Sequence, residues 1–479
     1  MAPTEGPRRS GAVLKDRMRG GGGSASEQPG GVAVASLEEA GADPSELRRK
    51  IEDRTALIGI IGLGYVGLPL SLAFAESGFH VLGFDVDGAK VEALEAGRNY
   101  IKHLRPERLT ESLESGRFRS TSEFARLSEP DVLIVCVPTP LTRQREPDLS
   151  FVVGTAQQIA ARLRRGHLVI LESTTYPGTT DELVRGIFEQ TGLATGRDYF
   201  LAFSPEREDP GNARYGTATI PKVVGGVDRD SGDLAQALYA QVISATVRVS
   251  NARTAEATKL LENIFRAVNI ALVNELKIVF DRMEIDIWEV LDAAATKPFG
   301  FMRFNPGPGW GGHCIPLDPF YLTWKAREHG IATRFIELAG EVNQQMPRWV
   351  VEKLRLALND RRKAVRGSRV LVLGLAYKKN IDDARESPAF EIIELLLQQG
   401  AVVSYHDPHV PRLPVTRSWS HLPPLASVPL SPGILEDSDA ALIVTDHSTV
   451  DYDMVSRHAP LVVDTRGIYR DPLPNVVRA

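Results

Sequence analysis

The sequence predicts an α/β fold in which two doubly wound, Rossmann-like parallel-sheet domains are joined by a long central helix. Three observations lead to this fold class. Short β-branched runs alternate with helical stretches from Leu57 onward, a second alternation begins at Arg369, and residues 251–283 between them contain neither glycine nor proline. Regular alternation of strands and helices is typical of parallel sheets covered by helices on both faces.

With 479 residues, the chain is long enough for about three domains of ordinary size. We expect a disordered tail rich in glycine, serine and proline over residues 1–50 and a first α/β domain over 51–250. A central helical segment is expected over 251–350 and a second α/β domain over 351–479.

The composition limits the partners that we expect. Lysine and arginine number 56, aspartate and glutamate 61, and the net charge is −5. Because nucleic-acid-binding domains usually present a basic face, we expect no nucleic-acid partner. Cys136 and Cys314 are the only cysteines, which leaves neither a disulfide framework nor a CxxC zinc site. We therefore expect a cytoplasmic protein without a bound metal.

Residues 56–75 carry no charge and are long enough to span a membrane. Glycine and proline interrupt this stretch in a way that is typical of a strand, a tight turn and a helix. The interrupting residues are Gly59, Gly62, Gly64, Gly67 and Pro69. We therefore expect no membrane insertion.

In the first domain, short apolar runs separated by helical stretches predict parallel strands. The runs are LIGII, HVLGFD, DVLIVCV, HLVILE, DYFLAF and KVVGG. In the second domain the corresponding runs are RVLVLG, AVVSYHD, AALIVTD and PLVVD. A proline-rich stretch after AVVSYHD predicts one long surface loop.

Residues 251–283 follow helical periodicity and predict one long helix. Its apolar positions cover a broad face, so we expect burial on more than one side, as in an interdomain spine or a dimer interface. These positions are Leu260, Ile264, Phe265, Val268, Leu272, Leu276 and Val279.

Gly62, Gly64 and Gly67 form a GxGxxG pattern between the first expected strand and a helix. In that context the pattern predicts a dinucleotide-binding turn with the pyrophosphate at the helix N-terminus. Asp85 ends the next strand, where a carboxylate accepts hydrogen bonds from a ribose and repels a 2′-phosphate, which favours NAD over NADP. The alternative is a close strand-to-helix turn with Asp85 as a surface turn residue.

Residues 297–321 combine glycine and proline with aromatic residues, which predicts an ordered loop near a ligand. Cys314 lies among glycines and is the candidate nucleophile, whereas Cys136 lies in an apolar run and is expected only to pack. Asp318 precedes a proline and is compatible with a helix N-cap as well as with proton transfer.

Along the long helix, Lys259 and Asn263 are one turn apart, with Glu256 and Arg266 continuing the same stripe. Taken alone, this pattern is typical of a solvated polar face.

Six segments occur in one order: GLGYVGLPL, LESTTYPGTT, SPEREDPGN, EATKLLENIFRAVNIALVNEL, GPGWGGHCIPLDPFYL and GLAYKKNIDDARES. Together they resemble the UDP-glucose/GDP-mannose 6-dehydrogenase family from about residue 55 to 470. The segment GGHCIPLDPFYLTWKARE looks like the branch that oxidises UDP-N-acetylglucosamine. The resemblance implies an NAD-binding first domain, a central dimerisation segment and a second domain that binds the UDP-sugar.

The resemblance also implies roles for single residues. Cys314 would be the nucleophile, Lys259 and Asp318 a proton-handling pair, and Asn263 the amide beside the reacting carbon. Thr175 would position a water, and Glu206 would belong to a substrate loop. The remaining implied contacts are with NAD through Tyr65, Val66, Thr139, Thr175 and Arg385, and with the sugar nucleotide through Glu206, Lys259, Asn263, Gly311 and Lys378.

The reaction implied by the resemblance converts the C6 alcohol of a UDP-sugar into a carboxylate, using two NAD and one water. A thiohemiacetal and then a thioester on Cys314 would hold the intermediate. Whether Asp318 or Glu206 assists hydrolysis stays open. UDP-N-acetylglucosamine is the expected substrate, with UDP-glucose, UDP-N-acetylgalactosamine, UDP-N-acetylmannosamine and GDP-mannose as alternatives, and a homodimer is the expected assembly.

Two other interpretations compete with this one. The first is a two-electron enzyme on the same fold, such as an epimerase or a 2-hydroxyacid dehydrogenase, in which Cys314 is structural. The second is a noncatalytic protein that only binds NAD or another nucleotide. Counting NADH per substrate separates the first from a four-electron dehydrogenase, and the absence of turnover would favour the second.

Overall fold

The computed structural model describes residues 41–101, 104–142, 146–207, 216, 218–312, 315–416 and 419–479. Its first element is helix α1 (Pro44–Glu52). The helix begins before residue 50, where the disordered tail was expected to end. The Asp43 side chain accepts a hydrogen bond from the backbone N–H of Ser45, and Pro44 occupies the first turn. Leu47 and Ile51 are buried in the core of the first domain.

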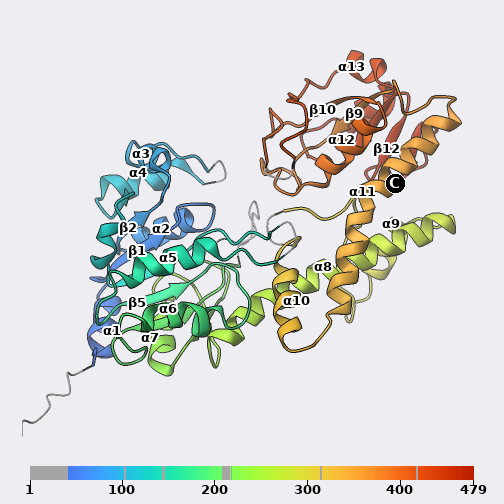
Figure 1. Ribbon diagram of the computed structural model, residues 1–479. Helices are drawn as coiled ribbons and strands as arrows, with labels where there is room; N and C mark the ends of the chain where they lie inside the picture. The colour runs from blue at the N-terminus through green and yellow to red at the C-terminus, as the bar shows by residue number, and fades with distance from the viewer. Residues whose placement is uncertain are drawn as a thin grey trace, which may run out of the picture. The chain divides into compact units, whose positions relative to one another are not determined.

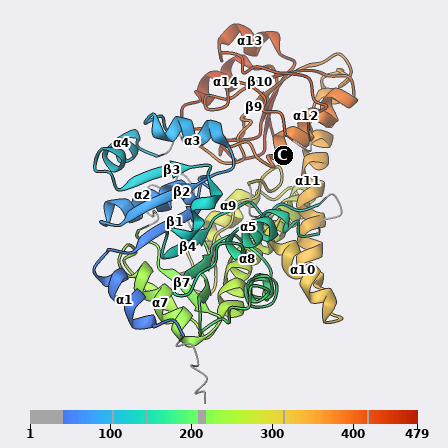
Figure 2. The ribbon, with the colours of Figure 1, turned by 60° about the vertical axis from the view of Figure 1, so that its left-hand side comes forward.

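The first domain contains an eight-stranded sheet with the order β3-β2-β1-β4-β5-β6-β7-β8. Figure 2 shows part of this sheet in blue to green. The strands are β1 (Leu57–Ile61), β2 (His80–Phe84), β3 (Phe118–Thr121), β4 (Val132–Val135), β5 (Leu168–Leu171), β6 (Phe200–Phe203), β7 (Lys222–Gly226) and β8 (Thr246–Arg248).

All neighbouring strands of this sheet are parallel except β6 and β7, which are antiparallel. The expectation that KVVGG joins the sheet as another parallel strand is therefore wrong at this one pair. Among the described residues between β6 and β7 there is no crossover helix, and an antiparallel return needs none.

Helices cover both faces of the first sheet. Ile58 and Ile60 of β1 belong to one hydrophobic cluster and Ile61 to another, as expected when alternate side chains point to opposite faces. The covering helices are α2 (Gly67–Glu76), α3 (Gly88–Glu95), α4 (Pro106–Glu114), α5 (Ser150–Ala160), α6 (Arg185–Glu189) and α7 (Arg229–Tyr239), with a 3₁₀ turn η1 (Phe124–Ser128) and a π-helical turn η2 (Thr179–Val184).

The central segment is built on helix α8 (Ala252–Arg282), which packs against α10 (Asp318–Glu328) and α11 (Arg334–Asp360), with α9 (Ile287–Ala294) following it (Figure 1). The side chain of Asn251 caps α8 by accepting the N–H of Thr254 at 2.8 Å.

The apolar face of α8 is only partly covered within one chain. Leu260 is buried, whereas Phe265, Leu272 and Val279 are exposed by 45%, 51% and 43%. The expected burial on more than one side is therefore not achieved by the described residues of a single chain.

Two buried asparagines join α8 to α11 and to the loop that precedes Cys314. Asn274 Nδ2 donates to Asn343 Oδ1 at 2.7 Å, and Asn274 Oδ1 accepts the N–H of Gly307 at 2.9 Å. Asn343 Nδ2 in turn donates to the carbonyl of Ala339 at 2.9 Å. Because both amides are buried, each group needs its partner, and the loop is fixed in place by them.

The second domain is a five-stranded parallel sheet with the order β10-β9-β11-β12-β13. Its strands are β9 (Arg369–Leu373), β10 (Val402–His406), β11 (Ala440–Ile443), β12 (Val462–Asp464) and β13 (Val476–Arg478). Its helices are α12 (Pro388–Gln398), α13 (Pro432–Asp437) and α14 (Tyr452–His458). The predicted fold class, two such domains joined by a long helix, is confirmed.

Within the described ranges, no helix combines the length and the apolar character that a membrane span requires.

Asn274→Ala should lower the free energy of unfolding by about 2–3 kcal/mol, because the buried amide of Asn343 and the N–H of Gly307 lose a partner. Urea unfolding followed by circular dichroism measures this change. Asn269→Ala is the matched control, since the Asn269 amide bonds only to the carbonyl of Phe265 on its own helix at an exposed position. Equal losses in both variants would contradict the proposed coupling.

Candidate active site

The turn between β1 and α2 has the shape that a dinucleotide requires. Gly62 has φ +94°, which favours glycine, and a Cβ on Gly67 would lie 1.9 Å from the carbonyl oxygen of Gly62. A Cβ on Gly64 would meet no atom within 4 Å, so open space lies above this residue. Gly62 and Gly67 therefore allow the tight turn, and Gly64 leaves room for a bound group at the N-terminus of α2.

Asp85 follows β2 beside this turn. Its Oδ2 accepts the N–H of Leu63 at 3.0 Å, and its Oδ1 accepts the N–H of Asp87 at 2.9 Å. Lys90 Nζ lies 3.5 Å from Oδ2. The carboxylate is thus held next to the glycine turn, where it can accept ribose hydroxyls. These residues fit NAD.

A cavity of about 290 Å³ brings together residues from distant parts of the chain. Ten of the predicted site residues line it: Gly64, Tyr65, Val66, Thr139, Glu206, Lys259, Gly311, Asp318, Lys378 and Arg385. Five others do not belong to its lining: Gly62, Gly67, Asp85, Thr175 and Asn263. Cys314 lies outside the described residues, and its neighbours Gly312 and Ile315 line the cavity.

A larger cavity, of about 810 Å³, borders the same loop at Gly309 and Trp310, but its lining contains none of the predicted site residues that the structure describes. Chemistry rather than size therefore identifies the smaller cavity as the candidate active site.

The polar stripe of α8 is buried, so the interpretation of a solvated face is wrong. Glu256, Lys259 and Asn263 are exposed by 0%, 8% and 4%. Only Arg266 is exposed, and it lines the cavity. The reason is that α10 and the loop before η2 cover this face, which helical periodicity alone does not reveal.

Asp318 is the first residue of α10, and its carboxylate does not cap the helix as the sequence suggested. Instead, Asn263 Nδ2 donates to Asp318 Oδ2 at 2.5 Å. Burial raises the pKa of Asp318 to about 6, while the charge of Lys259 and the bond from Asn263 act in the opposite direction. A carboxylate with such a pKa accepts and returns protons near neutral pH.

Glu256 ties α8 to the loop that carries Thr175. Its carboxylate accepts the N–H of Gly178 at 2.7 Å, and the N–H and hydroxyl of Thr180 at 2.9 and 2.7 Å. Burial raises the pKa of Glu256 to about 7 against these hydrogen bonds. On the same loop, Thr175 Oγ1 is buried and has no hydrogen-bond partner among the described residues, which suits a group that binds a ligand or water.

A buried charge network that the sequence did not reveal supports Glu206. Lys222 Nζ lies 2.9 Å from Glu172 and 3.3 Å from Glu206, and the Tyr239 hydroxyl donates to Glu172. The only signal in the sequence was a carboxylate, Glu172, directly after the apolar strand LVIL.

Cys136 lies just after β4 and packs against the core of the first domain, as expected, and it also lines the cavity. Burial, together with the nearby charge of Glu172, raises the pKa of its thiol well above the ordinary value. The cavity therefore contains one thiol that is unsuited to act as a thiolate.

Arg385 connects the second domain to the glycine turn. Its guanidinium lies 4.9 Å from the ring centroid of Tyr65 and pairs with Asp383 at 2.6 Å. Its backbone carbonyl accepts the N–H of Gly312 at 3.1 Å, two residues before Cys314. Segments of all three parts of the chain thus meet around the cavity.

The sequence matches three consecutive domain models of the UDP-glucose/GDP-mannose dehydrogenase family. The NAD binding domain matches residues 56–243, the central domain 253–345 and the UDP binding domain 371–471.

Curated relatives of the chain include proteins that are 33–39% identical to it over the aligned residues. The UDP-N-acetyl-D-glucosamine 6-dehydrogenase of Pseudomonas aeruginosa is 39% identical over 74% of this chain and 83% of its own length. The UDP-N-acetyl-D-mannosamine dehydrogenase of Pyrococcus horikoshii is 34% identical over 87% of this chain and 96% of its own length. A solved structure of UDP-D-ManNAc dehydrogenase from Pyrococcus horikoshii superposes with a TM-score of 0.80 at 33% identity, covering 88% of this chain and 98% of that one.

The glycine turn can be tested with two alanine variants. Gly64→Ala should weaken NAD binding at least tenfold with little loss of stability, because its Cβ enters open space that the bound pyrophosphate needs. Gly67→Ala should instead lower the thermal stability, because its Cβ collides with the carbonyl of Gly62. Isothermal titration with NAD and thermal unfolding measure the two effects, and the prediction fails if both variants behave alike.

Asp318→Asn should stabilise the protein at pH 8 and abolish turnover. Since the folded-state pKa is raised to about 6, the protonated carboxyl stabilises the fold at acid pH, and this contribution disappears as the pH rises through 6. A neutral amide avoids the buried charge, so we expect a gain of about 1–3 kcal/mol at pH 8 and none at pH 4. Urea unfolding at both pH values measures it, and a gain independent of pH would contradict the explanation.

Proposed function

The chain belongs to the UDP-glucose/GDP-mannose dehydrogenase family and is an NAD-dependent nucleotide-sugar dehydrogenase, and from this premise we propose that it oxidises C6 of UDP-N-acetyl-D-glucosamine to the carboxylate. The observation that carries the proposal is the cavity in which Gly64 of the NAD-binding domain, Lys259 of α8 and Lys378 of the UDP-binding domain converge.

The choice of substrate rests on the relatives. Enzymes named for UDP-N-acetyl-D-glucosamine from Pseudomonas aeruginosa and Salmonella typhi are 39% and 37% identical to this chain. Relatives named for UDP-N-acetyl-D-mannosamine and for an N-acetylgalactosaminuronic acid are each 34% identical. The shared element of these names is an N-acetylated sugar, so the nearest alternatives to our proposal are its other epimers.

Bound NAD supplies the acceptor for the hydride that leaves C6 in each of the two oxidations. In the first, the proton-handling pair formed by Lys259 and Asp318 takes the proton of the C6 hydroxyl, leaving an aldehyde. The Cys314 sulfur then adds to the aldehyde carbon and forms a thiohemiacetal, whose oxidation gives a thioester.

Hydrolysis of the thioester completes the reaction. Thr175 positions the water, and Asp318 or Glu206 removes its proton, after which the C–S bond breaks and the thiol is regenerated. Lys259 and Asn263 stabilise the oxyanion that forms at C6. The sum is one alcohol, two NAD and one water converted to one carboxylate, two NADH and three protons.

Assembly into a homodimer belongs to the proposal. The exposed apolar side chains Phe265, Leu272 and Val279 lie on one helix, and their cover by a second copy would complete the burial that one chain leaves unfinished. We place the enzyme in the cytoplasm because its thiol chemistry needs a reduced Cys314.

The decisive experiment is a panel of UDP- and GDP-sugars with purified protein, recording NADH yield and product mass. We expect two NADH per molecule of UDP-N-acetylglucosamine and a product that is heavier by one oxygen and lighter by two hydrogens. One NADH per substrate would indicate a two-electron enzyme, and preference for another sugar would reassign the substrate.

Cys314→Ser should stop acid formation and leave NAD binding intact, because serine does not form a thioester. Cys136→Ser is the matched control: it should retain two NADH per substrate even where its rate falls, since that thiol is held protonated. Mass spectrometry of the product and NAD titration measure both variants. Acid production by Cys314→Ser at the wild-type rate would disprove covalent catalysis.

A further inference from the structure

The second domain repeats one detail of the NAD-binding domain at its second strand. Asp407 directly follows β10 as Asp85 directly follows β2. Each carboxylate accepts backbone N–H groups of the turn after the neighbouring strand, and each turn begins with a glycine of positive φ: Gly62 at +94° and Gly374 at +90°.

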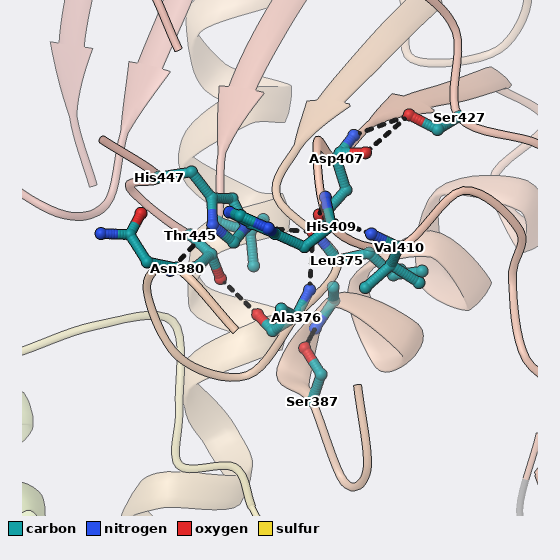
Figure 3. Close-up of polar contacts among 12 residues, drawn as sticks. Leu375, Ala376, Asn380, Ser387, Asp407, His409, Val410, Ser427, Thr445 and His447 are labelled. Atoms are coloured by element: carbon teal, nitrogen blue, oxygen red, sulfur yellow. Dashed lines mark hydrogen bonds and ion pairs between the residues drawn. The ribbon is translucent and has the colours of Figure 1, made fainter. Parts of the chain in front are cut away.

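The two aspartates differ in how much hydrogen-bonding capacity their carboxylate oxygens keep for a ligand. Asp407 Oδ2 accepts the N–H of Leu375 at 2.6 Å and of Ala376 at 2.9 Å, and it lies 3.0 Å from His447 Nε2 (Figure 3). Asp407 Oδ1 accepts two more backbone N–H groups, those of His409 at 2.8 Å and Val410 at 3.0 Å. Two oxygens with five donors have no capacity left for a ligand hydroxyl.

His447 connects Asp407 to Asn380, at the far end of the loop that begins at Leu375. It is completely buried, its Nε2 faces the carboxylate of Asp407, and its Nδ1 accepts the N–H of Asn380 at 3.0 Å. With Nδ1 acting as an acceptor, Nε2 is the ring nitrogen that donates to Asp407. Between these contacts, the hydroxyl of Thr445 donates to the carbonyl of Ala376 at 2.6 Å.

The loop held in this way, residues 375–380, carries Tyr377 and Lys378, and both line the candidate active site. Asp407 and Thr445 fix its beginning, and His447 fixes its end. None of the three anchoring side chains belongs to the lining of the cavity. They act on the site only through the loop.

We infer that Asp407 and His447 are positioning residues that hold the 375–380 loop so that Lys378 meets the nucleotide sugar. The inference rests on the proposed function, which gives Lys378 its role in substrate binding. A long lysine side chain loses conformational entropy when it binds a ligand. If the backbone of the loop is already fixed, binding costs no further entropy for ordering the loop.

Two variants of His447 separate its two hydrogen bonds. His447→Gln keeps a donor near Asp407 and loses the acceptor for the Asn380 N–H, whereas His447→Asn does the reverse. Each should weaken UDP binding roughly tenfold, as measured by isothermal titration with UDP, and leave NAD affinity unchanged. His458→Gln changes a partly exposed histidine of the same domain, which is the matched control and should alter neither affinity.

Thr445→Val tests the positioning of the 375–380 loop in a second way if the His447 variants do not fold. It removes the bond to the Ala376 carbonyl and leaves Asp407 and His447 intact. It should raise the KM for the nucleotide sugar with little change in kcat. A fall in kcat and in NAD affinity together would show a general loss of structure and overturn the inference.

The double variant decides whether His447 acts through Lys378. Lys378→Ala should itself weaken UDP binding, and in that background His447→Gln should add less than a twofold effect. A full tenfold effect in both backgrounds would overturn the positioning role and leave the proposed function standing. Unchanged UDP affinity in Lys378→Ala alone would remove Lys378 from the proposed substrate site, and the inference would fall with it.

Discussion

The burial of one polar face of α8 is the constraint on which the rest of the site depends. Glu256, Lys259 and Asn263 occupy successive turns of this helix and are all removed from water. Such burial is costly unless every group finds a partner, and the partners come from two other parts of the chain: the loop before η2 and the start of α10. The same contacts hold together the side chains to which the proposed mechanism assigns roles, as in the bond from Asn263 to Asp318.

Much of the fold follows from local pattern, since the apolar runs and the long helix free of glycine and proline appear where the sequence predicts them. The strands that were missed, β3, β8 and β13, contain at most two consecutive apolar residues, whereas the equally short strands β4 and β12 lie in longer apolar runs. The antiparallel pairing of β6 and β7 was not predicted, because the composition of a strand carries no information on its direction relative to its neighbour.

Some parts of the candidate site were likewise predictable from local sequence, and others were not. The glycine turn and Asp85 were predictable because the motif and its partner lie within one strand–helix–strand unit. The network of Glu172, Lys222 and Tyr239 was not, because its members are separated by 50 residues or more from Glu172 and meet only through the sheet. The sequence pattern also misjudged the polar stripe of α8, because its exposure is decided by the segments that pack against it.

The state of Cys136 has a practical consequence. The chain has two cysteines, and burial beside a carboxylate keeps the thiol of Cys136 protonated. Alkylating reagents attack thiolates, so the native protein offers them at most one competent sulfur. A maleimide dye or an electrophilic inhibitor added at neutral pH would therefore mark at most one position, without any need to engineer the other cysteine away.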